Sequence, residues 1–159
     1  MYKKILVPLD GSKVSASVLP QVIELAKAFS SQVILFHSCT ASVDPAMGEA
    51  AGQVKDIAAA AEQKACETFL SDAARGLKEQ GIDVNTVCVT GSPALEIIGY
   101  ADENKVDLIV MASHGRGEVA WILGSVAERV VTHATVPLLL HRVLKPQRPM
   151  PRGEYVGMP

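Results

Sequence analysis

The chain has 159 residues and a mass of 16.9 kDa, which suits one domain of ordinary size. Hydrophobic residues make up 48% of it and charged residues 20%, so disorder of the whole chain is excluded. The 15 basic and 17 acidic residues give a formal net charge of -2, and this balance argues against a nucleic-acid or anionic-membrane partner.

The sequence at the start of the chain favours a cytoplasmic localisation. Lys3 and Lys4 precede an apolar run, as in a signal peptide, but Asp10 ends that run too early for one. No apolar stretch of the sequence approaches the roughly 18 residues that a membrane span requires. We therefore expect a cytoplasmic protein that binds neither nucleic acid nor membrane.

Short apolar runs recur along the chain and predict the strands of a sheet. Most are nearly uninterrupted in Val, Ile and Leu, which is typical of parallel strands covered on both faces. The runs are Ile5–Leu9, Val33–His37, Val84–Val89, Leu108–Met111 and Val136–His141.

Segments with helical spacing lie between these runs. The longest carries an apolar stripe at intervals of three or four residues and is followed by Gly81, a helix stop. That stripe is Val54, Ala58, Ala61, Ala65, Phe69, Ala73 and Leu77. A further helix is expected from Ser92, with Pro93 in its first turn, to about Asn104. The alternation predicts an α/β fold, a three-layer α/β/α sandwich around a five-stranded parallel sheet of the Rossmann-like kind.

Two segments stand apart from this alternation. Thr40–Gly52 is rich in small residues and is expected to be a mobile loop. Val143–Pro159 is proline-containing and almost without periodicity. We divide the chain into a domain at 1–142 and a C-terminal tail at 143–159, which is either an extended end or an arm that packs on a partner subunit.

The cysteines and histidines show no metal-binding spacing. Cys39, Cys66 and Cys88 form no CxxC pair, and the four histidines form no HxH or HExxH pattern. We therefore expect buried, reduced thiols and no zinc site. His37 and His141 are expected to be core or edge histidines, and His133 to face water.

Ligands of an open parallel sheet bind at the carboxyl ends of its strands. This rule selects Pro8–Ser12, His37–Thr40 and Ala112–Ser125. The last is the richest, because glycines near both of its ends allow a phosphate to approach backbone amides. Ser125 is also an N-cap candidate, with Glu128 completing a capping box. Free amides at such a helix start attract an anion, but a cap and two turns without a ligand are the alternative.

Individual side chains in these segments leave two roles open. Asp10 either caps the following turn or accepts hydrogen bonds from ribose hydroxyls. His114 and Arg116 either contact a phosphate or face solvent. Gly115-x-Gly117 with Ala120 matches a dinucleotide fingerprint by letter, but it follows the wrong strand. No Gly-Lys-Ser/Thr of a Walker A motif occurs in the sequence.

Four stretches of the chain together resemble the universal stress protein family. They are KILVPLDGS at Lys4–Ser12, VDLIVMASHGRG at Val106–Gly117, LGSVAERV at Leu123–Val130 and VPLLL at Val136–Leu140. The resemblance covers about residues 2–142. It implies a five-stranded parallel sheet of the adenine-nucleotide α-hydrolase-like type, a homodimer through the last strand, and an ATP site in one branch of the family.

The resemblance also implies the nucleotide-binding residues. Asp10 would meet the ribose hydroxyls, the backbone of Ser38 the adenine edge, and Met111 the nucleoside. The full set is Pro8, Leu9, Asp10, Ser38, Met111, Ala112, Ser113, His114, Gly115, Arg116, Gly124, Ser125 and Val126.

The chain departs from the glycine pattern of that branch, which reads Gly-x2-Gly-x9-Gly-Ser/Thr. Ala112 stands where the first glycine is expected, and only eight residues separate Gly115 from Gly124. A methyl group at Ala112 narrows the approach of a phosphate, but the backbone amides remain. We therefore expect binding to survive.

The leading hypothesis is a stress-response protein that binds ATP, AMP or a cyclic nucleotide as a conformational or partner switch. A slow ATPase and a nucleotide-free dimeric adaptor are the alternatives. Fast turnover is not expected, since Glu118 is the nearest carboxylate to the glycine turns. Mg²⁺ would then be held mainly by the phosphates. The dimer would form through Val136–Leu140, and a further protein partner is left unnamed.

Overall fold

The computed structural model describes residues 1–39, 51–114 and 123–142, with the backbone alone at 51–55. Its centre is a parallel five-stranded sheet with the strand order β3-β2-β1-β4-β5. The strands are β1 (Lys4–Pro8), β2 (Gln32–Cys39), β3 (Asp83–Thr90), β4 (Leu108–Ala112) and β5 (Leu138–His141). The predicted α/β class and five-stranded parallel sheet are confirmed.

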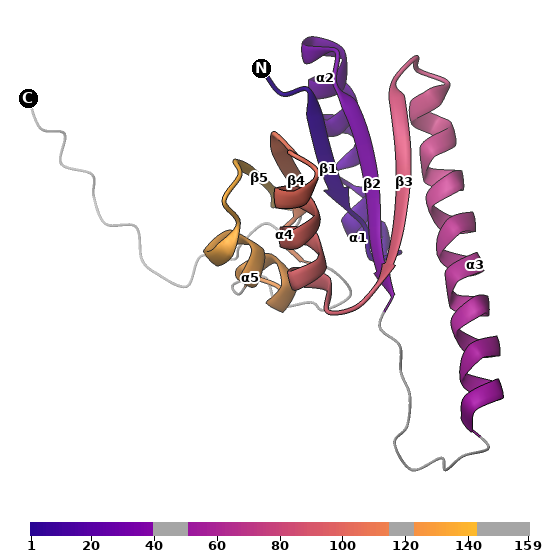
Figure 1. The fold of residues 1–159 in the computed structure, drawn as a ribbon. Coiled ribbons are helices and arrows are strands. Elements are labelled where there is room, and N and C mark those ends of the chain that lie inside the picture. The colour runs from indigo at the N-terminus through magenta and orange to yellow at the C-terminus, as the bar shows by residue number, and fades with distance from the viewer. Residues whose placement is uncertain (40–50, 115–122, 143–159) are drawn as a thin grey trace, which may run out of the picture.

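Helices cover both faces of the sheet (Figure 1). They are α1 (Lys13–Ala16), α2 (Leu19–Phe29), α3 (Ala51–Lys78), α4 (Pro93–Glu103) and α5 (Ser125–His133). Buried residues of α2 and α3 pack with one set of strand side chains, and those of α4 and α5 with the other set. These are the three layers that the alternation of runs predicts.

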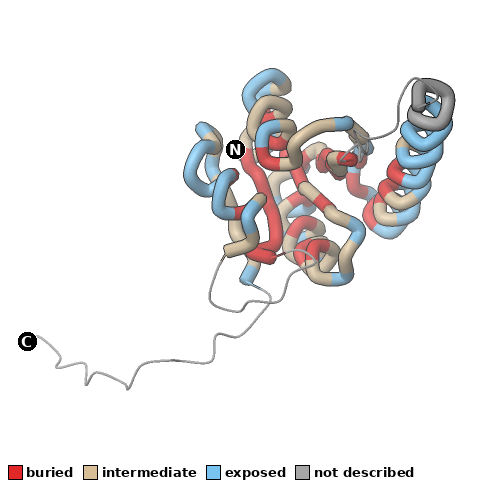
Figure 2. The backbone as a smooth tube through the Cα atoms, turned by 90° about the horizontal axis from the view of Figure 1, so that it is seen from below, coloured by how far each residue is buried: buried red, intermediate tan, exposed pale blue. Residues whose placement is uncertain are grey.

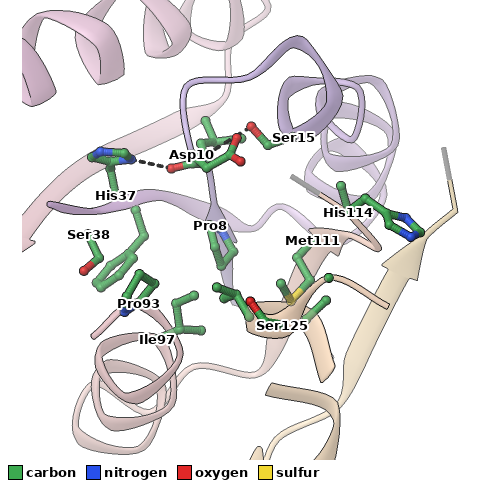
Figure 3. Close-up of a pocket in the computed structure, with 16 residues that line it drawn as sticks. Pro8, Asp10, Ser15, His37, Ser38, Pro93, Ile97, Met111, His114 and Ser125 are labelled. Carbon is green, nitrogen blue, oxygen red and sulfur yellow. Dashed lines mark hydrogen bonds between the residues drawn. The ribbon is translucent and has the colours of Figure 1, made fainter. Parts of the chain in front are cut away.

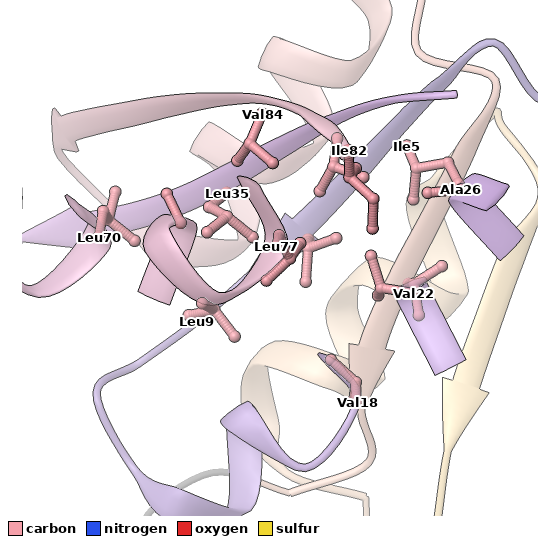
Figure 4. Close-up of a cluster of buried hydrophobic side chains, with 14 of the residues drawn as sticks. Ile5, Leu9, Val18, Val22, Ala26, Leu35, Leu70, Leu77, Ile82 and Val84 are labelled. Atoms are coloured by element: carbon pink, nitrogen blue, oxygen red, sulfur yellow. The ribbon is translucent and has the colours of Figure 1, made fainter. Parts of the chain in front are cut away.

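The core consists of two apolar layers that alternate along each strand. In β1, Ile5 and Val7 pack toward α2 and α3, whereas Leu6 packs toward α4 and α5. Figure 4 shows the first layer, in which Val22 of α2 and Leu70 and Leu77 of α3 lie against the strands. In Figure 2 the buried residues run through the middle of the molecule, between helices whose outer sides are exposed.

The predicted strand bounds differ from the observed ones at two places. β2 continues to Cys39, two residues past the predicted end, because it pairs with β3 along its whole length. β5 begins at Leu138, not at Val136. Pro137 has no N–H to donate to a ladder, and its carbonyl accepts the first bond, from Ile109 N at 2.9 Å.

The predicted stripe on the long helix is wrong in its first half. Ala58, Ala61 and Ala65 are exposed, and the buried face of α3 is formed by Cys66, Leu70, Ala74 and Leu77. In Figure 1 the first turns of α3 extend past the end of β2, so among the described elements no strand lies beneath them. The predicted stop is confirmed, because Gly81 has a φ of 78° just after the helix.

The helix that we expected from Ser92 to about Asn104 is confirmed. Ser92 is the N-cap of α4, Pro93 stands in its first turn and Asn104 is the C-cap. No helix in the described part of the chain is both long and apolar enough to span a membrane.

The prediction of three reduced thiols is wrong for two of them. Cys66 of α3 and Cys88 of β3 form a disulfide, and Cys39 is a free, buried cysteine. The two partners are 22 residues apart in sequence, and α3 lies directly over β3. This pairing depends on the packing of a helix on a strand, which the spacing of cysteines in the sequence does not reveal.

Candidate functional site

A cavity of about 310 Å³ lies at the carboxyl ends of β1, β2 and β4. The chain leaves β1 toward β2 and β3 on one side and later returns to β4 on the other, so the sheet reverses its order beside β1. Ligands of doubly wound sheets bind at such a switch point. The cavity volume is at the lower end of the range of about 300–1,000 Å³ for small-molecule sites.

The cavity has a mostly apolar wall with a few polar groups (Figure 3). Its apolar lining is Pro8, Leu9, Phe36, Pro93, Ile97, Met111, Ala112, Val126 and Ala127. Its other lining residues are Asp10, Ser15, His37, Ser38, His114, Gly124 and Ser125. This composition suits a ligand with a flat apolar part and a polar or charged part.

Asp10 follows β1 and organises the turn into α1. Its Oδ1 accepts from the backbone N–H of Ser12 at 2.9 Å and from the hydroxyl of Ser12 at 2.6 Å. Ser12 in turn caps α1 by accepting from Ser15 N at 3.0 Å. The turn-forming role that the sequence left open for Asp10 is therefore present. A carboxylate offers about four acceptor positions, so this role is compatible with a ligand contact.

The end of β2 exposes strand backbone to the cavity. The last register pair of β1 with β2 is Pro8 with Phe36, and Leu9 N donates to Phe36 O at 2.8 Å. On the other side of β2, Gly91 N donates to Cys39 O at 3.0 Å. Since backbone groups in a parallel strand alternate between the two sides, those of Ser38 face the β1 side, where the cavity lies.

The side chains of Ser38 and His37 are held in place. The Ser38 hydroxyl donates to Gly91 O at 2.9 Å. His37 Nδ1 is 2.6 Å from Leu9 O, and since a carbonyl can only accept, the nitrogen donates. His37 was expected to be a core or edge histidine, and this half-buried, hydrogen-bonded ring agrees with that reading.

Two polar residues directly after β4 are buried. Ser113 is fully buried and His114 is 7% exposed. The Ser113 hydroxyl is 2.8 Å from His114 Nδ1. The solvent-facing alternative for His114 is thus wrong, because its ring is enclosed at the cavity wall. Ser113 itself does not line the cavity.

The start of α5 forms the opposite wall. Gly124 is its N-cap and makes no side-chain cap hydrogen bond, whereas Ser125 is the first helical residue. Our assignment of Ser125 as the N-cap of a capping box is therefore wrong by one position. Gly124 N donates to Ser113 O at 2.9 Å, which ties the helix start to the end of β4. The N–H groups of the first turn have no intrahelical acceptor and carry the positive end of the helix dipole.

Two ionisable groups near the cavity have shifted pKa values. Burial raises the pKa of Tyr100, whose ring centroid is 5.3 Å from that of Phe36 in the cavity wall. Burial, with a smaller contribution from the nearby Glu62 carboxylate, raises the pKa of the Cys39 thiol. Both groups are therefore neutral at physiological pH, and neither is poised as a nucleophile.

The structure gathers most of the expected site residues around this cavity. Those that line it are Pro8, Leu9, Asp10, Ser38, Met111, Ala112, His114, Gly124, Ser125 and Val126. Gly115 and Arg116 lie outside the described residues, as do Glu118, residues 40–50 and the tail at 143–159. The lining residues outside the expected set are Ser15, Phe36, His37, Pro93, Ile97 and Ala127. Of these, the sequence pointed only to Phe36 and His37, at the end of a predicted strand, and to Pro93, at the start of a predicted helix.

Known proteins share both the sequence and the fold of this chain. A model of the universal stress protein family matches residues 1–142. Universal stress protein MJ0531 of Methanocaldococcus jannaschii is 34% identical over 149 residues, which cover 93% of this chain and 85% of that protein. The solved structure of MJ0577 from the same organism has a TM-score of 0.80 at 26% identity and covers 92% of this chain and 99% of its own.

Two solved complexes of more distant universal stress proteins show the same fold. One, in complex with cAMP, has a TM-score of 0.67 at 22% identity and covers 89% of this chain and 97% of its own. The other, from Archaeoglobus fulgidus in complex with dAMP, has a TM-score of 0.61 at 24% identity and covers 87% of this chain and 97% of its own.

Proposed function

The chain belongs to the universal stress protein family, and we propose that it binds an adenine nucleotide (ATP, or else AMP or a cyclic nucleotide) as a conformational or partner switch. One observation carries the proposal. A single cavity joins an apolar wall, a carboxylate at the end of β1 and the amide-bearing start of α5. The two complexes with cAMP and dAMP support an adenine nucleotide as the ligand class.

The adenine ring would lie against the apolar wall. Pro93 and Ile97 from α4 and Met111 from β4 supply flat or flexible apolar contacts on the walls of the cavity. The backbone N–H and C=O of Ser38 face the same space and would read the polar edge of the base. This arrangement uses main-chain groups for recognition, so it does not depend on the side chain at that position.

The ribose would bind through Asp10. Its carboxylate is fixed by the Ser12 turn, so its orientation is set before a ligand arrives. Ribose hydroxyls donate to carboxylates, and hydrogen bonds to charged groups contribute about 1.5–3 kcal/mol each. Asp10 thus serves the turn and the ligand with the same carboxylate.

The phosphates would lie at the start of α5. The amides of Ser125, Val126 and Ala127, which have no acceptor within the helix, and the dipole of the helix favour an anion there. His114 lines the same cavity. Gly115 and Arg116 would approach the phosphates from the segment outside the described residues. Ala112, in the place of a family glycine, lies in the wall of the cavity.

We propose that hydrolysis of the bound ATP is slow. Asp10 is the only carboxylate among the described lining residues, and it already holds the Ser12 turn. Efficient phosphoryl transfer needs groups that position a water molecule and hold the metal ion. Mg²⁺ would therefore be bound mainly through the phosphates, and the protein acts as a switch and not as a fast enzyme.

We also propose a cytoplasmic homodimer that forms through β5. The two edges of the sheet differ in character. On β3 the exposed positions are polar, namely Asp83, Asn85, Thr86 and Thr90. On β5, Leu138, Leu139 and Leu140 remain half-exposed, although β5 pairs with β4. An apolar edge strand invites pairing, so a second copy of this chain would occupy the β5 edge. A further protein partner would respond to the nucleotide state.

Calorimetric titration of nucleotide-free protein with ATP and Mg²⁺ tests the proposal. Trp121 is the single tryptophan and lies between Gly115 and Gly124 in the sequence, so its fluorescence should report phosphate binding in parallel. Saturable one-site binding is expected, with competition by AMP and cAMP defining the preferred nucleotide. Absence of binding at millimolar ATP would overturn the proposal and favour a nucleotide-free dimeric adaptor.

A further inference from the structure

Four metal-ligating side chains meet beneath α3, beside the cavity and on the opposite face of β2 from Ser38. A ring nitrogen of His37 and the sulfurs of Cys39 and Cys66 all lie within 4.8 Å of one another. Cys88 adjoins this group of three, because its sulfur is bonded to that of Cys66. We call His37, Cys39, Cys66 and Cys88 the Cys–His cluster.

The topology of the fold brings these residues together. His37 and Cys39 are two apart on β2 and therefore project from the same face of the sheet. Cys88 is the register partner of His37 on β3, and α3 packs over both strands and supplies Cys66. Cys39 and Cys66 are buried, while His37 and Cys88 are half-buried. The cluster is thus held by three elements of the core.

The hydrogen bond of His37 selects the tautomer that a metal needs. Nδ1 donates to the Leu9 carbonyl at 2.6 Å, so in the neutral ring Nε2 carries the lone pair. A backbone carbonyl that accepts from the second nitrogen is the usual support of a metal-binding histidine. Phe69 of α3 packs edge-on to the ring, with centroids 5.8 Å apart, and restricts its rotation.

We propose that the Cys–His cluster is a redox-gated zinc site. With the disulfide formed, Cys66 and Cys88 cannot act as thiolate ligands. A phosphine reductant with one water molecule converts the disulfide to two thiols and is itself oxidised to the phosphine oxide. Zn²⁺ then binds the sulfurs of Cys39, Cys66 and Cys88 and Nε2 of His37, and three thiol protons pass to the solvent.

The donor set and its spacing favour zinc over harder cations. Three thiolates and one imidazole form a closed tetrahedral site of the structural type. With a Zn–S bond of about 2.3 Å, two sulfurs on one ion lie about 3.8 Å apart. The ligand atoms of His37, Cys39 and Cys66, which are at most 4.8 Å apart, therefore require a movement of only about 1 Å. The sulfur of Cys88 must in addition separate from that of Cys66 by side-chain rotation once their bond is broken.

The zinc site does not rest on the nucleotide proposal, and its test leaves nucleotide out. The full chain is reduced with the phosphine, freed of it under anaerobic conditions and titrated with Co²⁺ and then with Zn²⁺. Nucleotide is omitted because its phosphates bind divalent cations. The expected result is one Co²⁺ per chain with thiolate-to-cobalt charge-transfer bands and tetrahedral d–d bands, which stoichiometric Zn²⁺ abolishes. Titration in weak buffer should show proton release.

The oxidised protein is the first control, because it has the same sequence and fold and its disulfide intact. It should bind neither ion at the stoichiometric concentrations that saturate the reduced protein. Cys39→Ser should weaken Zn²⁺ binding on the order of a hundredfold or more. It leaves the disulfide intact, so its fold can be checked in the oxidised form. His133→Gln, at an exposed position of α5, is the matched histidine control and should bind as the parent does.

Three results would overturn the zinc site. One is the absence of Co²⁺ binding by the reduced chain. Another is binding without charge-transfer bands, which would place the ion on other ligands. The third is equal affinity of the oxidised and reduced proteins or of Cys39→Ser and the parent. The oxidised and reduced proteins share one sequence, so the comparison of their affinities does not depend on whether a variant folds.

Discussion

The imidazole Nδ1 of His37 donates to the backbone carbonyl of Leu9 at 2.6 Å, and this bond connects the ends of β1 and β2. Leu9 directly precedes Asp10, so the bond fixes the point at which the chain leaves β1 for the cavity. A nitrogen of the same ring lies within 4.8 Å of the sulfurs of Cys39 and Cys66. The cavity and the Cys–His cluster therefore share the side chain of His37, and a shift of its ring would change both.

Replacement of Asp10 tests the ribose contact. We expect Asp10→Ala to weaken ATP binding ten- to a hundredfold, because a charged hydrogen bond contributes about 1.5–3 kcal/mol and 1.4 kcal/mol is tenfold. Calorimetric titration measures the change. Asp72→Ala, which breaks only the exposed pair with Arg75, is the matched control and should bind ATP as the parent does.

Since Asp10 also holds the turn at Ser12, the melting temperature of the variant must be measured beside its affinity. If Asp10→Ala binds ATP with unchanged affinity, Asp10 does not contact the nucleotide. Asp10→Asn keeps one acceptor oxygen, so its affinity for ATP should lie between those of Asp10→Ala and the parent.

A side chain at Gly124 tests the phosphate position. Gly124 has φ of -56° and ψ of 146°, a conformation open to any residue, so a substitution there adds volume without backbone strain. We expect Gly124→Val to abolish measurable ATP binding by filling the space in front of the α5 amides, and Gly124→Ala to weaken it. Gly76→Ala, where an added methyl group meets nothing within 4 Å, is the control. Parent-like affinity of Gly124→Val would mean that the phosphates bind elsewhere.

The sequence predicts the layers of the fold and the location of the site because both depend on local patterns. Uninterrupted apolar runs such as Ile5–Leu9 mark buried parallel strands, and polar or glycine residues after them mark the carboxyl ends of the sheet. These signals need no knowledge of contacts between distant segments. They placed Asp10, Ser38 and His114 around what proves to be one cavity.

The features that the sequence does not reveal are those that depend on packing between distant elements. Cys66 and Cys88 meet only because α3 lies over β3, and His37 joins them only through the β2–β3 register. The apolar lining from α4, such as Ile97, is likewise indistinguishable in sequence from ordinary core. The exposed alanines at the start of α3 follow an amphipathic pattern, but the sheet ends before it reaches them.

The apolar side chains of the edge strand β5 lead us to expect a dimer. Leu139 is half-buried on β5, where its backbone pairs with Val110 of β4, and no strand in the described part of the chain pairs with the outer edge of β5. We expect Leu139→Glu to convert dimers to monomers, because a charge at the centre of the interface is desolvated without a partner. Sedimentation velocity measures the change, and circular dichroism checks the fold. Thr86→Glu on the opposite edge should leave the sedimentation coefficient of the parent unchanged, and an unchanged coefficient for Leu139→Glu would place the interface elsewhere.

Substitutions at two positions on α3 distinguish the contribution of burial to stability from that of helix propensity. Leu70 is fully buried against the strands, whereas Ile57 on the same helix is 71% exposed. We expect Leu70→Ala to lower the free energy of unfolding by about 2–5 kcal/mol, since the cavity that it leaves cannot close completely. Ile57→Ala should change that free energy by no more than about 0.5 kcal/mol. Urea unfolding of both variants measures the difference, and similar losses would mean that the described face of α3 is not the packed one.

Reduction of the disulfide should destabilise the protein when no metal is present. The bond between Cys66 and Cys88 closes a loop of 22 residues, and the loss of that constraint on the unfolded chain costs about 3 kcal/mol. We expect the metal-free reduced protein to melt at a lower temperature than the oxidised protein in the same chelator-containing buffer. Zn²⁺ should restore the melting temperature of the reduced protein, because it links α3 to β2 and β3 as the disulfide links α3 to β3. A melting temperature that does not respond to reduction would show that α3 is held by its apolar face alone, and the covalent link would then add nothing to stability.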